Sequence, residues 1–263
     1  MKKVFDKDFL FLEEDIRILI SSYEKEGNLV KDDRNKLKEF KLNGLNIMIK
    51  SFKVPNLFNK IIYNFFRKGK AQRSFEHANL LISKGIKTPK PIGYFEEKSI
   101  LFFKRSFYVC NRIEYDFSMR VVVNNLNEIE NKKILKMFVK FTFDLHQKNV
   151  HFLDHSPGNT LVKIKNDKIY FYLIDLNRME FKKLSIKDRL INFSTICAHN
   201  QNKELVELIS NEYSNLIKID KNYAFKVIWE NMLKYNSSRN FKKKLKKYFK
   251  FFFFSKAKDA HIS

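Results

Sequence analysis

Alternating apolar and polar residues in the first half of the chain predict β-strands. The predicted strands are 28–31, 36–42, 45–53, 87–95 and 99–110. A polar turn at 32–35 separates the first two strands, and Asn43–Gly44 separates the next two. An Asn-Gly step between two such runs is a strong hairpin signal, so we expect a small antiparallel sheet.

Apolar residues at helical spacing predict helices in most of the remaining chain. The clearest example is 71–84, where Phe75, Ala78 and Leu81 recur and Gly85 follows as a C-cap. Residues 1–22 fit either a helix or a strand. The other predicted helices are 59–70, which is basic and aromatic, 127–149, 185–199, 203–216 and 222–235.

The order of these elements predicts an α+β fold. A chain of 263 residues suffices for one large domain or for two lobes that share a cleft. We place an N-terminal lobe over 1–110, made of the sheet and one helix, and a larger, mainly helical lobe over 111–263. The sequence contains no internal repeat and no apolar run long enough to cross a bilayer.

Net charge narrows the classes of partner. The chain has 52 Lys and Arg against 29 Asp and Glu, which gives +23. Such an excess favours nucleic acid, phosphorylated glycans or an anionic membrane surface. A biased genome composition could enrich Lys, but it does not explain why Lys outnumbers Glu so strongly. The tail 239–263 concentrates the charge and includes a run of four phenylalanines, 251–254, which either contact a membrane or cap the large lobe.

The cysteines and the N-terminus predict a cytoplasmic protein. Cys110 and Cys197 are far apart in the sequence and lack metal-ligand spacing, so we expect buried thiols in a reducing compartment. Acidic residues from Asp6 to Asp15 interrupt any signal-peptide apolar core.

The segment 151–178 contains the strongest chemical motif. Asp154 is followed five residues later by Asn159, and Asp175 ends an apolar, strand-like run. Kinases use an Asp and an Asn at this spacing, followed by a metal-binding Asp. Pro157–Gly158 predicts a turn that returns Asn159 to Asp154, and a hairpin around Asn166–Asp167 would place Asp175 beside them. The simpler alternative is a polar loop between a helix and a hairpin.

Lys50 and Glu76 complete a kinase-like order of residues. A lysine late in the third strand of a kinase small lobe pairs with the nucleotide phosphates, and a helix glutamate holds that lysine. Lys50 ends an alternating run, and Glu76 is the only acidic residue of the predicted helix 71–84. An exposed strand lysine and a solvated helix carboxylate are the alternatives.

With these residues in this order, the chain resembles the protein-kinase-like superfamily. More narrowly, it resembles the bacterial lipopolysaccharide core kinases, the Kdo and heptose kinases. The similar segments are the small-lobe helix and strand within 71–93, the Ile-Asp-Leu-Asn-Arg-Met sequence at 174–179, and the short return to a helix at 187–195. The resemblance covers about residues 25–200 and leaves no room for a long peptide-docking activation loop.

Two departures from the family pattern concern the loops. Phe152 stands two residues before Asp154, where relatives often have His, and His151 lies one position early. The chain also lacks a Gly-x-Gly-x-x-Gly loop over the phosphates. The turn 32–35, with its backbone amides and Arg34, is our candidate for that task, and these kinases tolerate a glycine-poor loop.

The resemblance implies an ATP-dependent kinase that phosphorylates a Kdo or heptose hydroxyl in the lipopolysaccharide inner core. Asp154 would orient the hydroxyl and take its proton, and Asn159 and Asp175 would hold Mg²⁺. Lys50, held by Glu76, would position the phosphates. The acceptor would be a core glycolipid at the anionic inner membrane, so we expect a peripheral cytoplasmic protein and no nucleic-acid partner.

Three alternatives remain open. A small-molecule phosphotransferase of the aminoglycoside-kinase type should have an acidic acceptor pocket, which the net charge disfavours. A non-enzymatic pseudokinase or membrane-associated binding protein would usually lack one of the motif residues, whereas all are present. A nucleic-acid-binding module would explain the charge and leave the motif unexplained.

Overall fold

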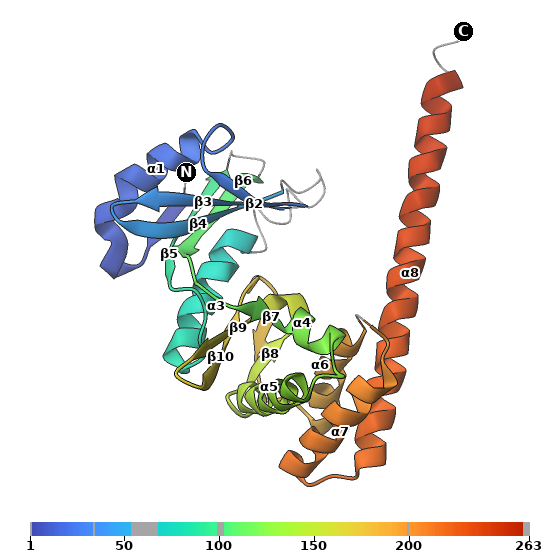
Figure 1. Ribbon diagram of the computed structural model, residues 1–263. Helices are drawn as coiled ribbons and strands as arrows, with labels where there is room; N and C mark the ends of the chain where they lie inside the picture. Colours follow the sequence, from blue (N-terminus) through green and yellow to red (C-terminus); the bar gives the residue numbers. More distant parts are fainter. Residues whose placement is uncertain (1, 34, 54–67, 99–102, 199, 260–263) are drawn as a thin grey trace. The chain divides into compact units, whose positions relative to one another are not determined.

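The computed structural model describes residues 2–33, 35–53, 68–98, 103–198 and 200–259 (Figure 1). The chain forms two compact units. The first comprises Met1–Met119, Phe152–Asp154 and Gly158–Glu180, and the second comprises Arg120–His151, His155–Pro157 and Phe181–Ser263. The lobe boundary at residue 110 stays a prediction.

The first unit is built on a six-stranded antiparallel sheet. Its order is β1-β5-β6-β4-β3-β2. The predicted strands are therefore confirmed within the described residues, and β1 is an addition that the sequence left open. The bounds are β1 Lys2–Phe5, β2 Asn28–Asp32, β3 Asn35–Leu42, β4 Leu45–Phe52, β5 Pro91–Lys98 and β6 Phe103–Asn111.

Turn chemistry fixes the central hairpin of this sheet. Asn43 and Gly44 have φ angles of 48° and 76°, and Leu42 pairs with Leu45 across the turn. Positive φ at both central residues is the type I′ geometry that Asn-Gly favours. The register of the β3–β4 pair then follows without interruption from Leu42↔Leu45 to Asn35↔Phe52.

Two helices cover opposite faces of the sheet. Helix α1 (Glu13–Ser21), preceded by the 3-10 turn η1 (Lys7–Leu12), packs Ile16 and Ile20 into one core cluster with Ile47 and Ile49 of β4. Helix α3 (Lys70–Ser83) packs against Met48 and Phe52 in a second cluster. Because strand side chains alternate between faces, Lys50 shares the α3 face with Met48 and Phe52.

A buried lysine fixes the connection from α1 to β2. Lys38 is 8% exposed, and its ammonium donates to the carbonyl oxygens of Tyr23 at 2.7 Å, Glu24 at 3.2 Å and Glu26 at 2.7 Å. Three acceptors satisfy all three N–H groups, which makes burial of this charge tolerable. The Tyr23 hydroxyl in turn donates to the Lys36 carbonyl at 3.0 Å.

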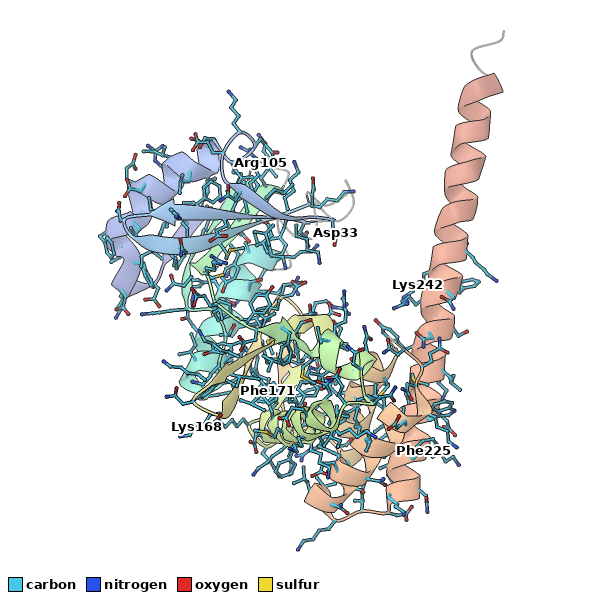
Figure 2. All side chains as sticks on the ribbon, viewed as in Figure 1. Asp33, Arg105, Lys168, Phe171, Phe225 and Lys242 are labelled. Carbon is cyan, nitrogen blue, oxygen red and sulfur yellow. The ribbon has the colours of Figure 1, made fainter. Side chains whose placement is uncertain are left out.

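The first unit also contains the hairpin that the motif required. Strands β9 (Thr160–Lys165) and β10 (Lys168–Leu173) join through Asn166–Asp167, both with positive φ, as predicted. A short strand β7 (Phe117–Ser118) extends this sheet. Figure 2 shows Lys168 at the turn end of the hairpin and Phe171 farther along β10. Strands β8 (Val150–Phe152) and β11 (Met179–Phe181) flank the motif in sequence.

The second unit is mainly helical. Helix α8 continues from the predicted 222–235 to Asp259, so the tail is part of one helix of 39 residues. The sequence did not predict α4, and the predicted helix 59–70 lies outside the described residues except for 68–70. The helices are α4 Met119–Asn124, α5 Ile129–Gln147, α6 Ile186–Cys197, α7 Lys203–Ile217 and α8 Lys221–Asp259.

Cys110 and Cys197 are buried and free, which confirms their expected burial.

Among the described helices, none is both long enough and apolar enough to cross a bilayer.

Candidate active site

The loop after β8 closes on itself as the sequence predicted. The Asn159 side-chain amide donates to the Asp154 carbonyl oxygen at 2.9 Å, and Pro157–Asn159 forms one 3-10 turn between them. The Asp154 side chain remains 34% exposed. The structure therefore brings the two loop residues together and leaves a carboxylate open to a substrate.

The strand after the hairpin places Asp175 beside this loop. The Ile174 N–H donates to the Asn159 carbonyl at 3.0 Å, so Asp175 follows immediately after a residue bonded to Asn159. Asp175 itself has a φ of 60°. Non-glycine residues in this left-handed region are uncommon, and such strained positions cluster at functional sites.

Lys50 contacts Asp175 directly. Its ammonium donates to Asp175 Oδ1 at 2.5 Å, and Asn177 Nδ2 donates to the same oxygen at 2.8 Å. Burial by itself raises the pKa of Asp175, but the Lys50 charge and these two hydrogen bonds outweigh it and lower the pKa. Asp175 is therefore an ionised carboxylate at neutral pH.

Glu76 has partners other than Lys50. Its carboxylate accepts from Lys68 at 2.8 Å and from Gln72, one turn earlier on α3, at 2.8 Å. Burial raises the pKa of Glu76, but the bonds from Lys68 and Gln72 bring it below its usual value. Within the described residues, no ion pair joins Glu76 to Lys50. Lys50, Asp154, Asn159 and Asp175 thus lie in the first unit. Glu76 lies in the same unit but contacts Lys68 and Gln72 instead of Lys50.

Arg34 lies outside the described residues, so its assigned role near the phosphates stays a prediction.

Three residues that the sequence reasoning passed over contact the site. His77 Nδ1 lies 2.6 Å from the Leu176 carbonyl oxygen and so links α3 to the residue after Asp175. Asn177 bonds Asp175, as described above. The Arg178 guanidinium lies 3.9 Å from Asp154 Oδ2. His77 directly follows Glu76, and Asn177 and Arg178 lie two and three residues after Asp175. This closeness in sequence to the motif residues could have identified them.

His155 supports the loop from the position after Asp154. It is fully buried, and its Nε2 lies 3.1 Å from the Thr142 hydroxyl of α5, which itself donates to the Phe138 carbonyl. The Thr195 hydroxyl of α6 donates to the His155 carbonyl at 2.8 Å. Two helices therefore fix the residue beside Asp154, where relatives often use a histidine two positions before the Asp.

The donor set suits a hard divalent cation. Asn159 and Asp175 supply an amide and a carboxylate, and magnesium prefers oxygen ligands of this kind. Lys50 adds a positive charge next to that carboxylate. With an open carboxylate at Asp154, the arrangement can hold a metal-bound polyphosphate on one side and an acceptor hydroxyl on the other.

Comparisons with known structures concern the fold. A structure of WaaP in complex with acyl carrier protein matches with a TM-score of 0.63 and 13% identity, covering 90% of this chain and 99% of WaaP. A mutant of the PknI kinase domain of Mycobacterium tuberculosis matches with a TM-score of 0.40 and 11% identity over 74% of this chain and 75% of its own. No curated protein matches the chain. The WaaP likeness confirms the predicted α+β, protein-kinase-like fold.

The sequence profile of one family matches most of the chain. The Lipopolysaccharide kinase (Kdo/WaaP) family is matched over residues 33–216, a range that includes Lys50, Glu76 and the whole 151–178 motif. The chain is therefore a phosphotransferase and belongs to the lipopolysaccharide kinase (Kdo/WaaP) family.

Proposed function

We propose that this kinase transfers the γ-phosphoryl group of ATP to a hydroxyl of a Kdo or heptose sugar in the lipopolysaccharide inner core. Family membership supports the glycolipid class of acceptor. The observation that carries the mechanism is the contact of Lys50 with Asp175, next to the Asn159–Asp154 hydrogen bond. These are the groups that phosphoryl transfer requires, and they lie in one compact unit.

On the acceptor side, Asp154 orients the sugar hydroxyl and takes its proton. The carboxylate is accessible, and the Asn159 amide and the buried His155 fix the backbone that follows it. Arg178, at 3.9 Å, keeps a positive charge beside this carboxylate. Positioning of this kind supplies much of the rate enhancement in phosphoryl transfer.

On the nucleotide side, Asn159 and Asp175 bind Mg²⁺, and Lys50 binds the phosphates. When bound, the metal neutralises charge on the transferring phosphoryl group. The phosphates compete with Asp175 for the Lys50 ammonium, so nucleotide binding loosens the 2.5 Å contact. Glu76 then holds Lys50 only if it leaves Lys68, its partner in this structure.

The C-terminal half of α8 contacts the anionic inner membrane that carries the acceptor. Residues 239–258 include no acidic residue, and Phe241 and Leu245 are 66% and 44% exposed. Each basic residue near an anionic leaflet contributes about 1 kcal/mol, and exposed rings can bury at the headgroup boundary. We therefore place the protein at the cytoplasmic face of that membrane as a peripheral protein.

Phosphoryl transfer from labelled ATP to purified, dephosphorylated inner-core glycolipid tests this function. Wild-type protein should label the glycolipid, and mass spectrometry and NMR of the product identify the sugar and hydroxyl. Asp154→Asn should lower turnover by at least about 100-fold while ATP affinity stays within about twofold, because the acceptor-side carboxylate does not bind the metal.

The matched control is Asp167→Asn at the β9–β10 turn, which makes the same change of charge at an exposed residue. It should retain wild-type turnover. Labelling of an aminoglycoside instead of the glycolipid would replace the proposed acceptor, and failure of wild type to label any sugar would reject the function.

A further inference from the structure

Strand β2 contains a β-bulge just before the turn at 32–35. Leu29 pairs with Lys38, but the next pair along the strands is Lys31 with Leu37, so Val30 is the extra residue. In a regular antiparallel ladder Val30 would oppose Leu37, and Lys31 would oppose Lys36. A one-residue shift exchanges the faces of all following side chains. The bulge therefore reverses the direction of the Lys31 side chain, and bulges often re-aim a side chain next to an active site.

The reversed side chain lies on the same face of the sheet as Lys50. Lys31 pairs with Leu37, and Leu37 pairs with Lys50. Directly paired residues of antiparallel strands have their side chains on one face. Lys31, Leu37 and Lys50 therefore form a row across β2, β3 and β4, on the face that also contacts α3.

The neighbouring row has the opposite orientation. Lys36 pairs with Asp32 on one side and with Ser51 on the other. Its ammonium binds Glu24, which follows α1, at 2.7 Å. Lys31 and Lys36 thus point to different faces of the sheet, and of the two only Lys31 shares the face of Lys50.

The surroundings of Lys31 are those of a cation that can accept an anionic ligand. Its side chain is 63% exposed, and its ammonium lies 3.1 Å from a carboxylate oxygen of Asp33. Figure 2 shows Asp33 at the end of β2, where the strand enters the turn.

We propose that Lys31 binds the β- and γ-phosphates of the nucleotide and substitutes for the amides of a glycine-rich loop. The inference rests on the proposed use of ATP. The turn contains Asp32 and Asp33, whose charges repel a triphosphate, together with the single cation Arg34, and it contains no glycine. Lys31 offsets that repulsion, first by pairing with Asp33 and then by exchanging this carboxylate for phosphate oxygens, which a lysine binds as a point charge.

The test compares four full-length variants by their affinity for ATP, ADP, AMP and adenosine in the presence of Mg²⁺. Lys31→Met should weaken ATP binding about tenfold and leave AMP and adenosine within about twofold, because only the outer phosphates reach Lys31. Lys31→Arg should recover most of the affinity. Lys36→Met removes the same charge from the other face and should bind ATP like wild type.

The fourth variant tests the face itself. Lys31→Asp combined with Asp32→Lys conserves the net charge and moves the lysine by one residue along β2, to the position that pairs with Lys36 on the other face. It should bind ATP at least as weakly as Lys31→Met. The melting temperature of each variant, measured without nucleotide, verifies that all four remain folded.

Two outcomes overturn the proposal while the proposed function stands. In the first, wild type turns over ATP and Lys31→Met binds ATP equally well. In the second, Lys31→Met weakens adenosine and ATP to the same extent, which would indicate a general disturbance of the fold. If wild type neither binds nor uses ATP, the proposed function fails, and the role of Lys31 fails with it.

Discussion

Asp175 combines a partly buried charge with an uncommon backbone conformation. It accepts hydrogen bonds from Lys50 and Asn177, and its φ is 60°. Asp and Asn tolerate this left-handed region better than other non-glycine residues. A substitution at Asp175 can therefore change the charge and the backbone strain. Two different substitutions separate these two effects.

Asp175→Asn should remove Mg²⁺-dependent ATP binding, because it deletes the charge of the proposed metal ligand and keeps the favoured backbone. Asp175→Ala should have the same effect on binding and also lower the stability by about 1 kcal/mol through strain. Titration of ATP with and without Mg²⁺, with urea unfolding alongside, measures both effects. An Asn variant with unchanged Mg²⁺-dependent affinity would remove Asp175 from the metal site.

The contact between the two loop residues could be predicted from the sequence because it depends on local spacing. Asp154 and Asn159 are five residues apart, and a short turn suffices to bring them together. The partner of Glu76 could not be predicted, because several lysines can reach a helix carboxylate and only the fold decides between them. In this structure Lys68 forms an ion pair with Glu76, and Lys50 forms one with Asp175.

Two buried histidines link elements of the second unit. His146 of α5 lies between the Tyr213 hydroxyl at 2.7 Å and Asn192 Oδ1 at 3.1 Å, which assigns its proton to Nε2. His155 is bonded to Thr142. Burial lowers the pKa of His146 to about 4 and that of His155 to about 3. Both are therefore neutral in the folded protein.

The second unit should lose stability as the pH falls from 7 to 5. The unfolded chain takes up protons at both histidines below pH 6.5, whereas the folded chain does so only near pH 4 and pH 3. Each histidine should cost about 1–2 kcal/mol over this interval. The single tryptophan, Trp229 on α8, reports urea unfolding of this unit.

His155→Asn provides the control for that titration. It should be less stable at pH 7, because it disturbs the bond to Thr142, but its stability should depend less on pH. A wild-type free energy of unfolding that is constant between pH 7 and pH 5 would show that these histidines are not held neutral.

Element prediction succeeded where the signal was local. The Asn43–Gly44 and Asn166–Asp167 turns specified their hairpins, since few residues adopt positive φ. The bulge at Val30 had no such signal, because it is a shift in pairing that composition does not reveal. Helix α4, Met119–Asn124, is too short for helical periodicity to emerge from its sequence.

At the scale of the whole molecule, part of the net charge of +23 lies in the basic C-terminal segment of helix α8. Helix α8 buries Val227, Ile228, Met232 and Asn236 within its unit. The described side chains from 237 to 245 are exposed, and Figure 2 shows Phe225 near the start of this helix and Lys242 farther along it. Among the side chains that the structure describes, packing of α8 therefore ends near Asn236.

Truncation after residue 238 should leave a folded kinase that no longer sediments with anionic liposomes. The removed residues contribute no described buried side chain, so the melting temperature should change by less than about 2 °C. Sedimentation with and without anionic lipid, in low and high salt, measures the loss. Truncated protein that sediments like the full chain would exclude α8 as the membrane contact, and unfolding of the truncated protein would make the tail part of the core.

The continuity of α8 also sets a length. From Asn236 to Asp259 the helix advances about 35 Å at 1.5 Å per residue, more than the thickness of a bilayer's hydrocarbon core. If this segment lies parallel to the membrane plane, it would hold the second unit against the lipid headgroups, within reach of sugars close to the bilayer. If it lies perpendicular to that plane, it would act as a spacer, and the enzyme would reach sugars much farther from the bilayer. The tilt of one helix would then decide which part of the glycolipid the enzyme can reach.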